Sequence, residues 1–152
     1  YGVSPFPDAT GADLGLRPVM SFETRVIAVK DLSAGDRVGY GGTWQARAPA
    51  RIAIAAAGYG DGYPRAAPNG TPVLVNGRPG ALAGRVSMDM LAIDVSGRDD
   101  VATGDPVQLW GPQLPVERVA AAAGTIGYEL ICRVSRHDGV TTAEGRTHAP
   151  ET

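Results

Sequence analysis

The clearest alternation of hydrophobic and polar residues begins in the segment VMSFETRVIAVK, residues 19–30. Met20 and Phe22 fall on one side of an extended chain, and Glu23 and Arg25 fall on the other. This period of two predicts a strand with one face against a core and the other face in water.

Short apolar runs separated by turn residues follow this strand. The runs are DRVGY, GTWQAR, RIAIAAA, TPVLVNG, ALAGRVS, LAIDVS and PVQLW. Within VNGRPG, the pair Asn76-Gly77 is the strongest short hairpin signal. Many short strands with regular turns, and no alternation of strands with long helices, indicate a mainly β, antiparallel barrel or sandwich.

Helical spacing appears only near the C-terminus. In LPVERVAAAAG, apolar residues recur at helical intervals, Pro115 stands in the first turn and Gly124 marks the end. A second short helix is predicted in TIGYELICRV, where Glu129 and Arg133 form a stabilising i,i+4 pair.

Both ends of the chain differ from the strand region in composition. Residues 1–18 are rich in proline and glycine and have no apolar periodicity, which predicts an arm or linker. The polar residues 141–152 predict a flexible tail. The β-domain is therefore expected to span residues 19–140.

Composition and charge exclude several classes of protein. A chain of 152 residues fits one domain, and a net charge of −2 gives no electrostatic footprint for nucleic acid. No apolar run approaches the roughly 20 residues that span a bilayer, and no signal-peptide pattern is present. Cys132 is the single cysteine, so no internal disulfide forms, and a reducing, cytoplasmic setting is expected. His137 and His148 lack metal-site spacing, so no metal site is predicted.

Tyr40 is the first candidate for chemistry, because GDRVGYGGTW flanks it with Gly39, Gly41 and Gly42. Glycines leave the backbone bare, which lets a ligand or another chain approach the ring closely. A tyrosine acts as a base only where nearby positive charge lowers its pKa from the ordinary value of about 10. The sequence offers no obvious cation for this, and Lys30, the single lysine, is expected to be exposed at a strand end. Taken alone, the pattern favours an ordinary strand tyrosine.

A second glycine-rich stretch, AAAGYGDGYPR, spans residues 55–65 and surrounds Tyr59. It lacks the Gly-Lys-Ser/Thr ending of a P-loop, and no helix follows it as in a dinucleotide-binding fingerprint. Asp61-Gly62 is a tight-turn signal. Taken alone, the stretch favours a hairpin loop.

The third stretch is GRVSMDM, residues 84–90. Met88 and Met90 fall on one face of an extended chain, so the simplest interpretation is two core methionines at the start of a strand. Alternatively, Arg85 and Asp89 beside a methionine with a free backbone N–H would suit a carboxylate ligand.

Taken together and in order, several segments resemble the C-terminal domain of alanine racemase. They are LRPVMSFETRVIAVK, GDRVGYGGTW, AAAGYGDGYPR, VLVNGRPGALAGRVSMDM and TIGYEL. The resemblance covers about residues 1–132 and is specific, because the motifs match in order and at compatible spacing. It implies a closed or partly closed, Greek-key-like antiparallel β-barrel with one or two short helices near the C-terminus. Residues 1–18 would then lead from a preceding barrel domain that this chain lacks.

The resemblance also implies a cofactor, a substrate and a partner. Members of this family are bacterial homodimers that interconvert L- and D-alanine, the latter a precursor of cell-wall peptidoglycan. They use pyridoxal 5'-phosphate held through a lysine of an N-terminal α/β barrel. The β-domain presents residues to the active site of the other subunit. No nucleic-acid or membrane partner is expected.

The same resemblance assigns site residues by position. Tyr40 matches the second catalytic base, and Met88 matches the residue whose backbone N–H contacts the substrate carboxylate. The remaining matches are expected at the active-site entrance: Tyr59, Arg65, Arg85 and Asp89. No residue of this chain is expected to bind the cofactor or a metal. Lys30 lies in the wrong domain to replace the barrel lysine, so the isolated chain is expected to be inactive.

Two alternatives to this hypothesis come from the same residues. The chain could be a non-catalytic β-barrel module for binding or dimerisation. It could also belong to a racemase that acts on another amino acid, because the part of the pocket that would select the substrate is missing.

Overall fold

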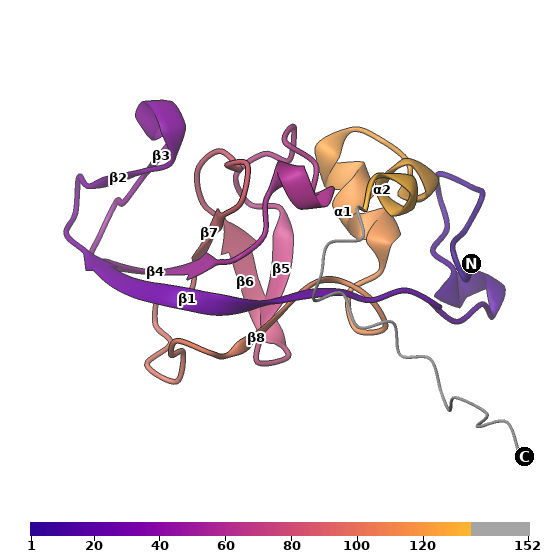
Figure 1. Ribbon diagram of the computed structural model, residues 1–152, viewed down its shortest axis with the longest axis horizontal. Helices are drawn as coiled ribbons and strands as arrows, with labels where there is room; N and C mark the ends of the chain where they lie inside the picture. Colours follow the sequence, from indigo (N-terminus) through magenta and orange to yellow (C-terminus); the bar gives the residue numbers. More distant parts are fainter. Residues whose placement is uncertain (135–152) are drawn as a thin grey trace, which may run out of the picture.

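The computed structural model describes residues 1–134 of the chain. Within them, six strands close into an antiparallel barrel in the order β1-β4-β7-β6-β5-β8, and two short helices lie beside it (Figure 1). The barrel strands are β1 (Phe22–Leu32), β4 (Ala50–Ala55), β5 (Pro72–Val75), β6 (Arg78–Leu82), β7 (Leu91–Asp94) and β8 (Pro106–Trp110). The predicted mainly β, antiparallel barrel is confirmed, and a sandwich is excluded. The predicted flexible tail, residues 141–152, lies outside the described residues.

β1 closes the barrel because it is long enough to pair with two strands. Its first part, from Phe22 to Arg25, pairs with β8, and its later part, from Val26 onward, pairs with β4. The register of the β4 pairing shifts between Val26 and Ala28. Such an irregularity bends a strand and increases its twist, which is what a small closed barrel needs.

The predicted Asn76-Gly77 hairpin is confirmed between β5 and β6. Val75 pairs with Arg78, so the two turn residues stand between paired strand ends. Their φ values are 53° for Asn76 and 70° for Gly77, the left-handed conformation that such a turn requires.

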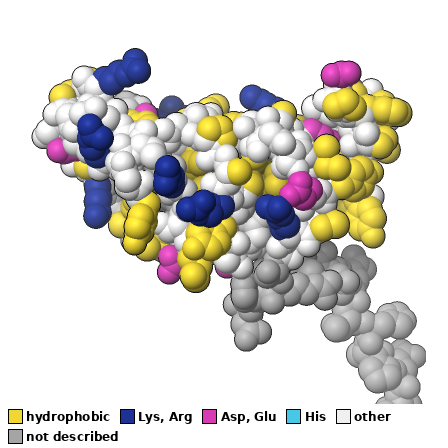
Figure 2. Space-filling view, turned by 90° about the horizontal axis from the view of Figure 1, so that it is seen from above, with side chains coloured by type: hydrophobic (Ala, Val, Ile, Leu, Met, Phe, Trp, Pro, Cys, Tyr) yellow, Lys and Arg dark blue, Asp and Glu magenta, His cyan; other side chains and the backbone are white. Residues whose placement is uncertain are grey.

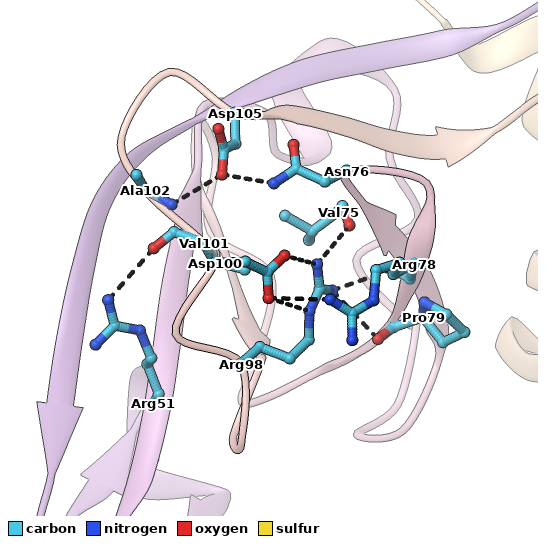
Figure 3. Close-up of polar contacts among 10 residues, drawn as sticks. All are labelled: Arg51, Val75, Asn76, Arg78, Pro79, Arg98, Asp100, Val101, Ala102 and Asp105. Atoms are coloured by element: carbon cyan, nitrogen blue, oxygen red, sulfur yellow. Dashed lines mark hydrogen bonds and ion pairs between the residues drawn. The ribbon is translucent and has the colours of Figure 1, made fainter.

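The buried Arg98 side chain holds this hairpin from the loop that follows β7 (Figure 3). Its guanidinium donates to the Val75 carbonyl at 2.9 Å, and it contacts the carbonyls of Arg78 and Pro79 at 3.3 and 3.5 Å. Asp100 accepts from the same guanidinium at 3.0 Å. The arginine therefore donates to three backbone carbonyls on the two strands that flank the turn.

Three aromatic rings dominate the barrel interior beside the helices. Trp110 packs edge-on against Phe22 at a centroid distance of 4.7 Å and stacks near Tyr63 at 6.0 Å. The Tyr63 hydroxyl and the Trp110 indole nitrogen are buried without a hydrogen-bond partner among the described residues. Burial raises the pKa of the Tyr63 phenol above its ordinary value, so this tyrosine stays neutral.

β4 is apolar on both faces because a second cluster lies outside the barrel. The hairpin of β2 (Arg37–Val38) and β3 (Trp44–Gln45) projects from one end of the molecule (Figure 1). Val38 and Trp44 of this hairpin pack on a cluster formed by Ile52, Ala83 and Ala92. The nearly continuous run RIAIAAA thus serves two cores, one inside the barrel and one under the hairpin.

Both predicted C-terminal helices are confirmed. α1 (Val116–Ala123) buries Val116, Val119 and Ala120 and ends at Gly124, whose φ is 73°. α2 (Gly127–Arg133) carries the predicted ion pair between Glu129 and Arg133, at 2.5 Å.

The N-terminal arm is docked on these helices, which its composition does not reveal. Val3 and Ser4 are buried, and the backbone N–H groups of Ser4 and Gly11 both donate to Glu117 Oε1 of α1, at 2.9 and 2.8 Å. The arm also forms a short turn at Ala12–Leu14. One carboxylate oxygen therefore holds two points of the arm from a helix that lies more than 100 positions further along the chain.

The surface agrees with the scattered basic residues of the sequence. Figure 2 shows lysine and arginine side chains as separate groups on one face, and hydrophobic side chains gathered at the end that carries the arm. Exposed apolar residues of the arm are Tyr1, Phe6, Leu14, Leu16 and Val19. Among residues 1–134, none of the helices is both long enough and apolar enough to cross a bilayer.

Replacing the buried Arg98 should test its role in holding the hairpin. We expect Arg98→Ala to lower the free energy of unfolding by about 2–4 kcal/mol, because the buried Val75 carbonyl and two part-buried carbonyls lose their donor. Arg78 is the matched control: it bonds the same Asp100 at 3.1 Å but is 61% exposed, so Arg78→Ala should cost much less. Urea unfolding followed by the fluorescence of Trp44 and Trp110 measures both, and equal losses would contradict the proposed role of Arg98.

The aspartates near this hairpin predict a loss of stability in acid. The Ala102 N–H, and then the Asn76 side chain, hold the pKa of Asp105 below its ordinary value of 3.8. The unfolded chain therefore binds protons at higher pH than the folded chain, and stability is lost as pH falls below about 5. The same urea titration between pH 7 and pH 3 should show a smaller acid loss for Asp105→Asn than for the native chain. An identical pH dependence in the two proteins would show that Asp105 does not contribute.

Candidate functional site

Two backbone contacts bring the three glycine-rich stretches together. In the first, the Tyr59 N–H donates to the Ser87 carbonyl at 3.0 Å, and the Gly60 N–H donates to the Met88 carbonyl at 2.8 Å. A Cβ atom on Gly58 would lie 2.2 Å from the Ser87 oxygen, so only glycine permits this approach. The loop that carries Tyr59 is therefore fixed against the segment that carries Met88.

The second contact joins the Tyr40 segment to the residues just before Met88. A Cβ atom on Gly39 would lie 2.7 Å from the Arg85 nitrogen, and one on Gly84 would lie 2.8 Å from the Val38 oxygen. Both glycines also have positive φ values, 81° and 85°. A contact within this chain therefore explains why Gly39 is glycine: it lets the backbone beside Tyr40 touch the backbone of Gly84 and Arg85. No atom lies within 4 Å of the Cβ position of Gly41.

Tyr40 begins a short 3₁₀ turn, Tyr40–Gly42, at the tip of the β2–β3 hairpin. The expectation of an ordinary strand tyrosine is wrong, because the left-handed Gly41 turns the chain at this point. Its side chain is 82% exposed, and its hydroxyl has no hydrogen-bond partner within residues 1–134. An exposed phenol on a fixed turn contrasts with the buried, neutral Tyr63.

Tyr59 lies in the 3₁₀ turn Tyr59–Asp61, which the Asp61 carboxylate closes by accepting from the Gly58 N–H at 2.9 Å. The hairpin-loop interpretation of residues 55–65 is wrong. These residues connect β4 to β5, and those two strands are not neighbours in the barrel. The segment crosses the barrel end instead, with the Tyr59 side chain 41% exposed.

Met88 and Met90 are not core residues, and that expectation is also wrong. Their side chains are 62% and 40% exposed, because residues 84–90 form a loop and β7 begins only at Leu91. The loop is held by the Ser87 N–H, which donates to the Met90 carbonyl at 2.9 Å. No acceptor for the Met88 N–H is present in the described part of the chain, which fits the alternative of a carboxylate-binding group.

The two predicted entrance arginines line one hollow. Arg65 and Arg85 are exposed and border a space of about 440 Å³. Its other lining residues are Thr43, Ala66, Ala67, Pro68, Asn69 and Gly84. Asp89 is exposed and follows Met88, but it does not line this hollow.

Asn69 joins two of these segments and was missed by the sequence interpretation. Its side-chain Nδ2 donates to the Thr43 carbonyl at 2.9 Å, and its Oδ1 accepts from the Gly84 N–H at 2.7 Å. In the sequence, Asn69-Gly70 looks like an ordinary turn pair. Nothing local in the sequence could reveal partners that lie 26 and 15 positions away.

The described residues offer little to hold a cofactor or a metal ion. No group of three His, Cys, Asp or Glu side chains in residues 1–134 is placed to bind a metal. Lys30 is exposed on β1 and does not line the hollow beside Arg65 and Arg85. What the site presents is an exposed phenol, a free backbone N–H and two arginines, on segments that the two backbone contacts hold together.

The fold and these residues define a class of protein: a closed antiparallel β-barrel domain with two short C-terminal helices and exposed tyrosines on its loops. The family model of the alanine racemase C-terminal domain matches residues 19–139. An alanine racemase from Nitrosomonas eutropha is 58% identical over 135 residues, covering 89% of this chain and 37% of that protein.

Solved structures agree with this match. The crystal structure of the biosynthetic alanine racemase from Pseudomonas aeruginosa is 54% identical, with a TM-score of 0.87 over 89% of this chain and 38% of that one. The alanine racemase from Bartonella henselae with covalently bound pyridoxal phosphate is 32% identical, with a TM-score of 0.72 over 76% of this chain and 33% of that one.

The chain belongs to the alanine racemase C-terminal domain family. It spans less than two-fifths of the length of these relatives, and the part it matches is the β-barrel domain described above.

Substituting Gly58 should release the Tyr59 loop. The φ of Gly58 is −150°, which alanine adopts freely, so Gly58→Ala acts only through the collision with Ser87 and Met88. Overpacking of this kind costs about 1–3 kcal/mol, which should speed exchange of the Tyr59 and Gly60 amides about 10- to 100-fold. Amide exchange followed by nuclear magnetic resonance measures it. The control is Gly70→Ala, which strains the backbone at a φ of 87° but causes no collision, because no atom lies within 4 Å of the Cβ position. It should leave exchange of the Tyr59 and Gly60 amides unchanged, and unchanged exchange in Gly58→Ala would contradict the packing argument.

Proposed function

We propose that this chain is the C-terminal domain of a pyridoxal phosphate-dependent alanine racemase that interconverts L- and D-alanine. The observation that carries the proposal is the exposed Tyr40 phenol on a glycine-bounded turn, in a domain of this family. The enzyme would be a cytoplasmic homodimer, and Tyr40 would reach the active site of the partner subunit. Its D-alanine would feed peptidoglycan synthesis.

Racemisation requires a proton to leave one face of the α-carbon and another to arrive on the opposite face. Bound pyridoxal phosphate supplies the electron sink for this exchange. Tyr40 would take the proton from L-alanine and return one when D-alanine is the substrate. A lysine of the partner's barrel would act on the other face.

The remaining site residues would place the substrate. The free Met88 N–H would donate a hydrogen bond to the substrate carboxylate. As a backbone group it is already in place before the substrate binds. Tyr59, Arg65, Arg85 and Asp89 would line the entrance, where two exposed arginines attract the carboxylate of the substrate.

The proposal assigns the cofactor lysine to another domain, and the lysine content of this chain agrees with that. A cofactor held as a lysine Schiff base needs a lysine in a sheltered site. Lys30, the one lysine, is exposed on a barrel strand. The cofactor lysine would belong to a preceding α/β barrel, from which residues 1–18 lead into the β-domain of residues 19–140. The 152-residue chain alone is then inactive.

Substituting Tyr40 in the whole enzyme tests the proposal. We expect Tyr40→Phe to lower racemase activity by about 10²–10⁴-fold, because the phenylalanine ring cannot carry the proton. Tyr63→Phe is the matched control, since it removes a tyrosine hydroxyl that is buried and has no hydrogen-bond partner among residues 1–134. Activity toward both alanine enantiomers is measured together with the dimer mass by sedimentation.

Near-normal activity of Tyr40→Phe would overturn the assignment and favour a non-catalytic module. Activity toward a different amino acid in a substrate panel would keep Tyr40 as the base but change the substrate.

A further inference from the structure

We propose that Asn69 is a positioning residue that sets where the Tyr40 base stands relative to the Met88 N–H. The inference rests on the proposed function, which assigns roles to Tyr40 and Met88 but none to Asn69. The side chain bonds Thr43 O at 2.9 Å and Gly84 N at 2.7 Å, and we call these two bonds the Asn69 clamp.

The first bond of the clamp reaches the turn that carries Tyr40. Thr43 directly follows the turn Tyr40–Gly42 and caps its end. A displacement of the Thr43 carbonyl therefore moves the turn and, with it, the phenol three residues earlier.

The second bond reaches the loop that carries Met88. Gly84 opens the segment GRVSMDM, and its N–H is buried enough to need an acceptor. One side chain thus spans the two segments that hold the proposed base and the proposed carboxylate contact. These two bonds connect the segments directly, and no barrel strand lies between them in this connection.

The hairpin of β2 and β3 needs such a connection, because it lies outside the closed sheet. Within residues 1–134, its two strands are hydrogen-bonded to each other and to no barrel strand, and each is two residues long. Next to the turn, Val38 and Trp44 pack on the outer cluster beneath them. Beyond this pair, the contact of Gly39 with Gly84 and the Asn69 clamp are the links to the rest of the chain that the described residues show.

The clamp is better suited to placement than to folding. Asn69 is exposed and belongs to none of the strands or helices described, so its removal leaves the barrel interior unchanged. Proton transfer is far more sensitive than folding to small displacements, and an error of about 1 Å can cost about 10²-fold in rate. A side chain outside the core can therefore matter mainly to the reaction.

The test replaces Asn69 in the whole enzyme and compares it with Gln45→Ala. Gln45 is a matched control in the same hairpin, because its side-chain amide also donates to a backbone carbonyl, that of Gly35 at 3.0 Å. We expect Asn69→Ala to lower kcat about 10- to 100-fold with little change in KM. Its melting temperature should fall modestly, because the buried Gly84 N–H loses its acceptor. Gln45→Ala should keep the native kcat and KM.

Two further readouts separate placement from general damage. With α-deuterated L-alanine, whose proton Tyr40 would remove, the isotope effect on kcat should rise in Asn69→Ala more than with α-deuterated D-alanine. Hydrogen exchange measured by mass spectrometry should become faster in the peptides that contain Gly42 and Gly84, without any substrate present.

Asn69→Asp separates the two bonds, because a carboxylate can accept from Gly84 N–H but cannot donate to Thr43 O. Exchange at Gly84 should stay slow in this variant, while kcat falls as in Asn69→Ala. Native kcat and native isotope effects in both Asn69 variants would overturn the inference. If Tyr40→Phe abolishes activity in the same enzyme, that result would leave the proposed function intact. If Tyr40→Phe is active, the proposed function itself fails.

Discussion

The arrangement of the site depends on two places where backbones touch with no side chain between them. Gly58 lies against Ser87 and Met88, and Gly39 lies against Gly84 and Arg85. The first contact joins two loops that leave barrel strands, and the second joins the β2–β3 hairpin to the loop after β6, so each of the three segments is fixed against another. The exposed Tyr40, Tyr59 and Met88 side chains are displayed on a rigid support, which is the arrangement that a precise site requires.

The closed barrel stabilises this support, because each of its strands is hydrogen-bonded to a neighbour on both sides. β1 bonds to β8 along its first part and to β4 along its later part, and this closes the sheet. At the turn between β5 and β6, the Arg98 guanidinium donates to the carbonyl oxygens of Val75 and Arg78 and so holds the hairpin. The ends of each loop are fixed because the barrel strands that they join are fixed. The glycines in the loops then allow their backbones to come into contact.

Much of the fold was predictable because it follows local rules. The period of two at residues 19–30, the Asn76-Gly77 turn and the helical spacing ahead of Gly124 each depend on a few neighbouring residues. The failures are non-local. Residues 55–65 have the turn chemistry of a hairpin, but β4 pairs with β7, which follows much later in the chain. Asn69 finds partners 26 and 15 positions away, and Glu117 binds the arm across more than 100 positions. The family resemblance identified Tyr40 and Met88 as candidates, whereas composition and spacing alone favoured a strand tyrosine and core methionines.

Closure of the barrel limits how another molecule can bind this domain. Every strand of the barrel in residues 1–134 has a hydrogen-bonded neighbour on both sides. A partner therefore cannot extend the sheet by adding a strand of its own at a barrel edge. Recognition by the barrel portion has to use loop tips and side chains, whose identity can change without disturbing the ladder of backbone bonds beneath them.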